Sequence, residues 1–168
     1  VDAVRAEGLR VGLYYSLIDW HHPDFPKFSD LNHPMRGNPA YQDEKIDFDR
    51  YLAYMHGQIE ELVTNYGKID ILWFDYAYDE LRGEAWKATE LIQMVRRHQP
   101  DVVIDNRLET SGEGFGSLVT EHPAYYSGDF VSPEQILPPE GIRNVRGERV
   151  PWELCTTMNN NWGYNPYD

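Results

Sequence analysis

One segment constrains the fold of this chain more than any other: residues 69–75, Ile-Asp-Ile-Leu-Trp-Phe-Asp, form an apolar run that ends in a carboxylate. Its β-branched and aromatic content predicts a β-strand. Because successive side chains of a strand point to opposite faces, Trp73 and Asp75 share one face with Ile69 and Ile71. An ionised carboxylate on an apolar face costs free energy unless it is paired or does chemistry. Asp75 is therefore either a cap for the turn that follows or a catalytic group.

The hydrophobic pattern along the chain predicts alternating helices and strands. Apolar residues recur every three or four positions in the helical segments, and Gly8, Gly67 and Pro100 end them. The expected helices are residues 1–8, 43–66 and 84–98, and the expected strands are residues 10–16, 69–75, 101–107 and 150–156. This order favours parallel βαβ units.

Polar and aromatic side chains gather at the C-terminal ends of the expected strands, at Tyr14 to Ser16, Asp75, Arg107 and the Asn-rich turn after Thr156. That placement is typical of a (β/α) barrel, whose C-terminal rim carries the chemistry. An open doubly wound sheet is the alternative, but no Gly-rich fingerprint follows a strand. A closed barrel takes about 250 residues. We therefore expect an α/β chain that forms about four strands of a TIM-like (β/α)8 barrel, without its N-terminal strands.

Two long loops follow the first and third expected strands. The first covers about residues 19–41 and is rich in His, Pro, Asn and aromatic residues. Loops longer than about 12–15 residues in a compact domain are usually functional. We expect this loop to form one wall of a cleft. The second covers residues 108–149 and carries many glycines, prolines and glutamates.

Composition excludes several classes of function. A net charge of -13 argues against nucleic acid or an anionic membrane surface as a partner, and a neutral ligand is easier to accommodate. Cys155 is the single cysteine, so neither a disulfide within the chain nor a Cys-based zinc site can form. His21 and His22 point apart in an extended segment, and Ser16 lacks the Gly-x-Ser-x-Gly elbow. We expect no metal and no cofactor.

The remaining chemistry is that of carboxylates and aromatic rings. Cleavage of a glycosidic bond requires two carboxyl groups, and an aromatic floor beneath Asp75 suits a sugar ring. The candidates for the second carboxylate are Glu109, Glu113, Glu121, Glu134, Glu140 and Glu153.

Five motifs in series resemble the alpha-L-fucosidases of glycoside hydrolase family 29. They are residues 12–16 with Asp19-Trp20, residues 70–75, Asp105-Asn106-Arg107, residues 128–134 and Trp152-Glu153 leading to Trp162-Gly163-Tyr164. The resemblance implies that residues 1–168 are part of a single glycoside hydrolase catalytic barrel domain. It also implies retaining hydrolysis of terminal alpha-L-fucosides, in a fucosylated glycan or a small fucoside, through a covalent fucosyl-enzyme intermediate.

The same resemblance assigns roles to residues of this chain. Asp75 corresponds to the nucleophile, and Glu134 to the acid/base, with Glu121 and Glu153 as alternatives. The fucose pocket would be lined by Tyr14, Trp73 and Arg107, with Trp162 adjoining it. Two other functions remain open: a non-catalytic carbohydrate-binding or scaffold module, and a retaining barrel glycosidase for another sugar.

Overall fold

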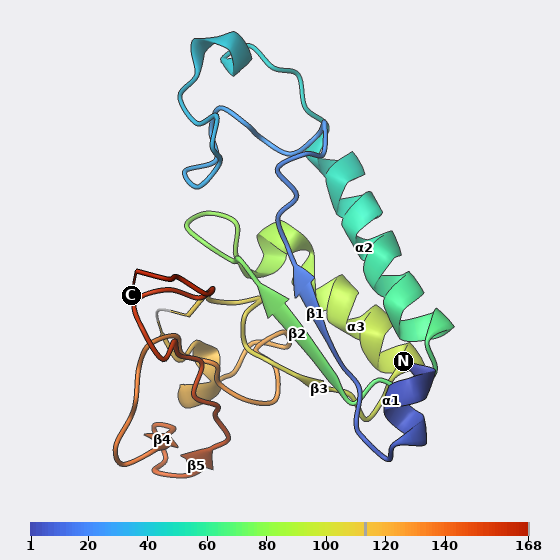
Figure 1. Ribbon diagram of the computed structural model, residues 1–168, viewed down its shortest axis with the longest axis vertical. Helices are drawn as coiled ribbons and strands as arrows, with labels where there is room; N and C mark the ends of the chain where they lie inside the picture. The colour runs from blue at the N-terminus through green and yellow to red at the C-terminus, as the bar shows by residue number, and fades with distance from the viewer. Residues whose placement is uncertain (113, 168) are drawn as a thin grey trace.

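The computed structural model describes residues 1–112 and 114–167 (Figure 1). Three short α/β steps build its main body, and irregular chain with short 3-10 turns makes up the rest. The α-helices are α1 (Asp2–Ala6), α2 (Phe48–Asn65) and α3 (Ala88–His98), the strands are β1 (Gly12–Ser16), β2 (Ile71–Asp75), β3 (Val103–Ile104), β4 (Ile142–Arg143) and β5 (Arg149–Val150), and the 3-10 turns are η1 (Pro39–Tyr41), η2 (Gly83–Trp86) and η3 (Ser117–Val119).

The first three strands form a parallel sheet in the order β1-β2-β3. Its register places Tyr14 beside Trp73 and Ser16 beside Asp75. Two adjacent parallel strands must be joined by a crossover connection. Helix α2 lies in the connection from β1 to β2, and α3 lies in the connection from β2 to β3. The predicted βαβ order is confirmed, and all three strands end at the same edge.

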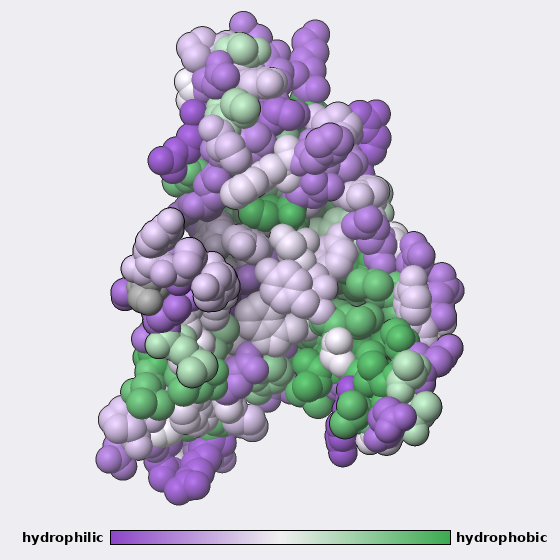
Figure 2. All heavy atoms as spheres, viewed as in Figure 1, coloured by the Kyte–Doolittle hydropathy of each residue, from purple (hydrophilic) through white to green (hydrophobic). Residues whose placement is uncertain are grey.

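The two faces of this sheet differ in burial. Leu72 and Phe74 of β2 are fully buried in a core to which α2 and α3 contribute. On the opposite face, Ile71 is 39% exposed and Val103 is 41% exposed. Figure 2 shows hydrophobic side chains gathered over the lower part of the molecule, where the strands of Figure 1 begin. The face that carries Trp73 and Asp75 is therefore open to solvent.

Local sequence explains where the helices begin and end. The Asp47 carboxylate accepts a hydrogen bond from the Arg50 amide and caps α2, which starts at Phe48, five residues later than predicted. Gly67 follows α2 with a φ of 70°, as a terminating glycine does. The predicted helix 84–98 is two elements, because Lys87 adopts a left-handed conformation between η2 and α3.

The predicted count of about four barrel strands is not confirmed, because three parallel strands form a sheet among the described residues. The segment 101–107 forms only the two-residue β3, and residues 149–150 pair antiparallel with β4. Beyond β3 the parallel arrangement continues as isolated bridges, from Asp105 to Phe130, from Val131 to Trp152 and from Glu134 to Cys155. Pro133 and Pro151 have no amide hydrogen to donate, so a continuous ladder cannot form there. The segment 130–134, expected to be loop, lies beside the end of β3.

No helix in the described part of the chain is long and apolar enough to cross a membrane.

Gly128 permits the approach of this segment to β3. Its φ is 78°, and a Cβ atom there would lie 2.1 Å from the backbone oxygen of Asp105. We predict that Gly128→Ala lowers the free energy of unfolding by about 2–4 kcal/mol, measured by denaturant unfolding of the complete protein. Gly57→Ala in α2, where a Cβ meets nothing within 4 Å, is the control and should stabilise by about 0.5–1 kcal/mol. Equal effects of the two substitutions would contradict the prediction.

Candidate active site

A pocket of about 360 Å³ lies at the C-terminal ends of the parallel strands. It brings together all six residues that the sequence assigned to the site. Three further side chains line it that the sequence analysis did not single out. The pocket is lined by Tyr14, Trp73, Asp75, Tyr76, Tyr78, Arg107, Glu134, Cys155 and Trp162.

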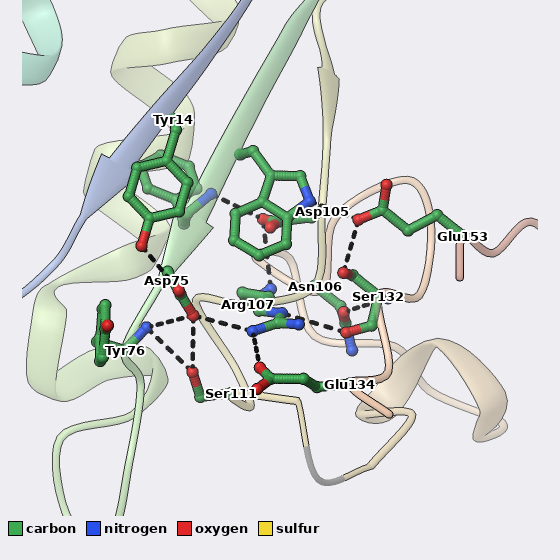
Figure 3. Close-up of polar contacts among 12 residues, drawn as sticks. Tyr14, Asp75, Tyr76, Asp105, Asn106, Arg107, Ser111, Ser132, Glu134 and Glu153 are labelled. Carbon is green, nitrogen blue, oxygen red and sulfur yellow. Dashed lines mark hydrogen bonds and ion pairs between the residues drawn. The ribbon is translucent and has the colours of Figure 1, made fainter. Parts of the chain in front are cut away.

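The two oxygens of Asp75 have unequal surroundings (Figure 3). Oδ1 accepts three hydrogen bonds, from the Tyr76 amide at 2.9 Å, the Ser111 hydroxyl at 3.1 Å and Arg107 Nη1 at 2.9 Å. Within the described part of the chain, Oδ2 accepts one hydrogen bond, from the Tyr14 hydroxyl at 2.8 Å. Asp75 does bond the turn that follows it, as the capping interpretation required, but its other partners come from two distant segments, Tyr14 from β1 and Arg107 and Ser111 from the stretch after β3.

Arg107 joins the two carboxylates of the pocket. Its side chain is 1% exposed, and its Nη1 lies 2.9 Å from Asp75 Oδ1 and 2.9 Å from Glu134 Oε2. The two acceptor oxygens are therefore no farther apart than the sum of these two distances. Burial alone would lower the pKa of Arg107, but the charge of Asp75 and the hydrogen bond to Glu134 raise this pKa above its usual value. The guanidinium is a permanent cation between two carboxylates.

An aromatic stack forms one wall of the pocket. The rings of Tyr14 and Trp73 are stacked with centroids 5.4 Å apart, and the Arg107 guanidinium carbon lies 4.5 Å from the Trp73 centroid. The Trp73 indole nitrogen donates to Glu153, which also accepts a hydrogen bond from the Ser132 hydroxyl. Glu153 thus fixes the orientation of Trp73 from outside the pocket.

Glu134 is the second carboxylate of the pocket, and the other candidates lie elsewhere. Glu109 accepts hydrogen bonds from the amide and hydroxyl of Ser117. Glu121 and Glu140 are exposed and do not line the pocket. Glu113 lies outside the described residues.

Loop geometry holds Glu134 against Arg107. The Glu134 amide donates to the Gly112 carbonyl at 2.8 Å. Gly112 has a φ of 79°, and a Cβ there would lie 2.7 Å from Glu134 Cβ, so only glycine fits. Neither Ser111 nor Gly112 was assigned to the site from the sequence, because a Ser-Gly pair in a Gly-rich loop carries no signal of its eventual contacts.

Burial and hydrogen bonding perturb the tyrosines around Asp75. Burial, together with the hydrogen bond to Asp75, raises the pKa of Tyr14 well above its usual value. Burial and the charge of Asp75 raise the pKa of Tyr78 to about 12. Both phenols therefore remain protonated at neutral pH, and Tyr14 stays a hydrogen-bond donor. Among the described residues no group of three or more His, Cys, Asp or Glu side chains is arranged to hold a metal ion.

Parallel strands that end in an aromatic-walled pocket, with two carboxylates on a buried arginine, are typical of α/β proteins that bind or cleave carbohydrates. The model of the alpha-L-fucosidase family matches residues 1–168. The chain belongs to this family.

Relatives and solved structures agree with the family assignment. Plasma alpha-L-fucosidase of Rattus norvegicus is 28% identical over 93% of this chain, and alpha-L-fucosidase of Dictyostelium discoideum is 25% identical over 99%. The structure of alpha-L-fucosidase isoenzyme 1 from Paenibacillus thiaminolyticus is 57% identical, with a TM-score of 0.90 over 99% of this chain and 38% of that chain. Alpha-L-fucosidase AlfC from Lactobacillus casei, in complex with alpha-L-fucose product, is 28% identical, with a TM-score of 0.68 over 99% of this chain and 47% of that chain.

The chain spans 28% of the length of the rat enzyme and 31% of the length of the Dictyostelium enzyme.

Asp105 lies directly behind the site and is completely buried. Its Oδ1 accepts from the Phe74 and Arg107 amides, whereas its Oδ2 has no hydrogen-bond partner among the described residues. Burial raises the pKa of this carboxyl group well above its usual value, against the lowering effect of the two amides and of the Arg107 charge.

We predict that Asp105→Asn stabilises the protein at neutral pH and not in acid. A raised folded-state pKa means that stability falls as pH rises from the unfolded-state pKa to the folded-state pKa, and the amide, which does not titrate, avoids this loss. Each unit of the shift corresponds to about 1.4 kcal/mol. Unfolding midpoints of both proteins from pH 3.5 to pH 8 test this. A difference that stays constant with pH would contradict it.

Proposed function

We propose that the complete protein hydrolyses terminal alpha-L-fucosides with retention of anomeric configuration, through a covalent fucosyl-enzyme intermediate. The observation that carries the proposal is the attachment of Asp75 and Glu134 to a single buried nitrogen of Arg107. Membership of the alpha-L-fucosidase family indicates that the sugar cleaved is alpha-L-fucose. The substrate is a fucosylated glycan or a small fucoside.

The unequal surroundings of the two Asp75 oxygens support different roles for them, one as the anchored oxygen and one as the attacking oxygen. Oδ1, with three donors, is the anchored oxygen. Among the described residues Tyr14 is the single donor to Oδ2, and Tyr14 is 56% exposed. We assign the attack on the anomeric carbon to Oδ2, because fewer hydrogen bonds leave more electron density available for the new bond.

Glu134 is the proposed acid/base. Its Oε2 is bound to Arg107, and its Oε1 has no hydrogen-bond partner among the described residues, so we assign proton transfer to Oε1. It first gives its proton to the leaving oxygen as the bond from that oxygen to the anomeric carbon breaks. It then takes a proton from the water that releases fucose from Asp75. Retention requires carboxyl groups about 5–5.5 Å apart, which the two 2.9 Å contacts to one nitrogen permit.

Arg107, Tyr14, Trp73 and Trp162 are proposed to bind the sugar. Trp73 and Tyr14 offer apolar ring surface, and Arg107 lines the pocket between the two carboxylates that it binds. The exposed inner face of the sheet supports the further proposal that residues 1–168 belong to one (β/α)8 catalytic barrel domain, because closure of a barrel would bury that face.

Release of the chromophore from an aryl alpha-L-fucoside by the complete protein tests this function. Wild type should turn over and release alpha-L-fucose first, as followed by NMR. Asp75→Asn should reduce kcat by at least about 10³-fold, because no carboxylate remains to form the ester. Glu134→Gln should spare formation of the fucosyl-enzyme from a good leaving group and slow its hydrolysis.

The same assay separates the alternatives. Turnover of other aryl glycosides but not of the fucoside would indicate a barrel glycosidase of another specificity. Fucose binding without any turnover would indicate a non-catalytic carbohydrate-binding module. Release of the beta anomer first would refute retention.

Ser111 provides a narrower prediction. Its hydroxyl donates to Asp75 Oδ1 and accepts from the Tyr76 amide at 3.0 Å, so it fixes the carboxylate plane. Loss of a hydrogen bond to a charged group costs about 1.5–3 kcal/mol, so Ser111→Ala should lower kcat about tenfold or more, with a smaller change in KM. Ser127→Ala, a buried serine that does not line the pocket, should leave both constants unchanged. An unchanged kcat in Ser111→Ala would remove Ser111 from the mechanism.

A further inference from the structure

A second pocket of about 350 Å³ adjoins the catalytic pocket. We call it the outer pocket. It lies between the long loop after β1 and the turn after β2, which are the segment above the sheet and the loop beside it in Figure 1. The loop contributes Pro26, Ser29 and residues 30–32, and the turn contributes residues 78–81. The prediction that the loop 19–41 forms a wall of a cleft thus agrees with the structure, although this cleft is not the catalytic pocket itself.

The two pockets share a wall. Tyr76 and Tyr78 line both of them, and their rings meet edge to face with centroids 5.5 Å apart. Tyr76 follows Asp75 directly and has a φ of 75°, a conformation rare for a residue with a side chain. A molecule that extends from Asp75 past these tyrosines enters the outer pocket.

The chemistry of the outer pocket suits a neutral sugar. Its polar lining consists of hydroxyl, amide and carboxylate groups, and Asp79 and Glu80 of the turn are exposed to solvent. Carboxylates accept hydrogen bonds from sugar hydroxyls. Tyr76, Tyr78 and Ile18 add apolar surface for the faces of a ring.

Charge narrows the ligand class further. Asp30, Asp79 and Glu80 line the outer pocket, whereas no Lys or Arg does so among the described residues. Arg36 lies in this loop, but its guanidinium donates to the Leu31 backbone carbonyl and it does not line the pocket. The carboxylates that line the outer pocket would repel an anionic ligand and so disfavour its binding.

We propose that the outer pocket binds the sugar on the leaving side of the fucoside and selects against leaving sugars that carry a carboxylate or sulfate. The inference rests on the proposed fucosidase function and adds the class of aglycone. Asp79 and Glu80 are the specificity-determining residues. They lie in a turn and are not part of the catalytic machinery.

The test uses a matched pair of substrates and the complete protein. One is a neutral fucosyl disaccharide, and the other is the same disaccharide with the hydroxymethyl group of its second sugar oxidised to a carboxylate. Wild type should cleave the anionic member with a kcat/KM at least about tenfold lower. This difference in kcat/KM between the two disaccharides, the gap, should become smaller in 1 M salt, which screens charges beyond about 3 Å.

The double variant Asp79→Asn, Glu80→Gln should close most of this gap and leave hydrolysis of an aryl fucoside unchanged. Glu61→Gln, which removes an exposed charge on α2, should leave the gap intact. Equal cleavage of the two disaccharides by wild type, or a gap that the double variant retains, would overturn the inference while aryl fucoside hydrolysis still supports the proposed function. Absence of aryl fucoside hydrolysis would refute the proposed function instead.

Discussion

The buried Arg107 guanidinium is the interaction on which the rest of the site depends. It brings together a carboxylate at the end of β2 and a carboxylate from the segment after β3, two parts of the chain that no regular hydrogen-bond ladder connects at that point. Burying a cation is costly, and removing one partner of such a group costs about 3–5 kcal/mol. The charges of Asp75 and Glu134, with the Ser132 carbonyl that Nε contacts, offset that cost. The same contacts that stabilise the arginine fix the spacing of the two carboxylates.

The parallel sheet brings the site residues to one edge, and the loops set the orientation of their side chains. Parallel strands end together, so Tyr14, Asp75 and Arg107 meet at one edge without any special local sequence. The orientation of each group is set by irregular chain: the Tyr76 amide at the start of the turn after β2 donates to Asp75, and the positive φ of Gly112 admits Glu134. Backbone strain at a functional site is retained where surrounding contacts fix it.

The acidity of the chain agrees with the chemistry proposed for both pockets. A sugar is neutral and rich in hydroxyl donors, so carboxylates around it act as hydrogen-bond acceptors and not as counter-ions. In the catalytic pocket Arg107 compensates for the two carboxylates, whereas no cation among the described residues lines the outer pocket. One tyrosine pair separates these two environments. Bond cleavage and choice of the leaving sugar are thereby assigned to different loops.

Much of this architecture follows from the sequence. The periods of the hydrophobic pattern predicted β1, β2, α2 and the parallel order, and strand parity placed Trp73 and Asp75 on one face, because these features depend on neighbours in the chain. Family motifs, not physics, singled out Glu134 among six candidate glutamates. Tertiary structure alone decided that Ser111 holds Asp75, that Glu153 orients Trp73, and that the predicted fourth strand is reduced to part of β5 and two isolated bridges. These depend on contacts between segments far apart in sequence, where backbone turns and prolines, and not local periodicity, determine which groups meet.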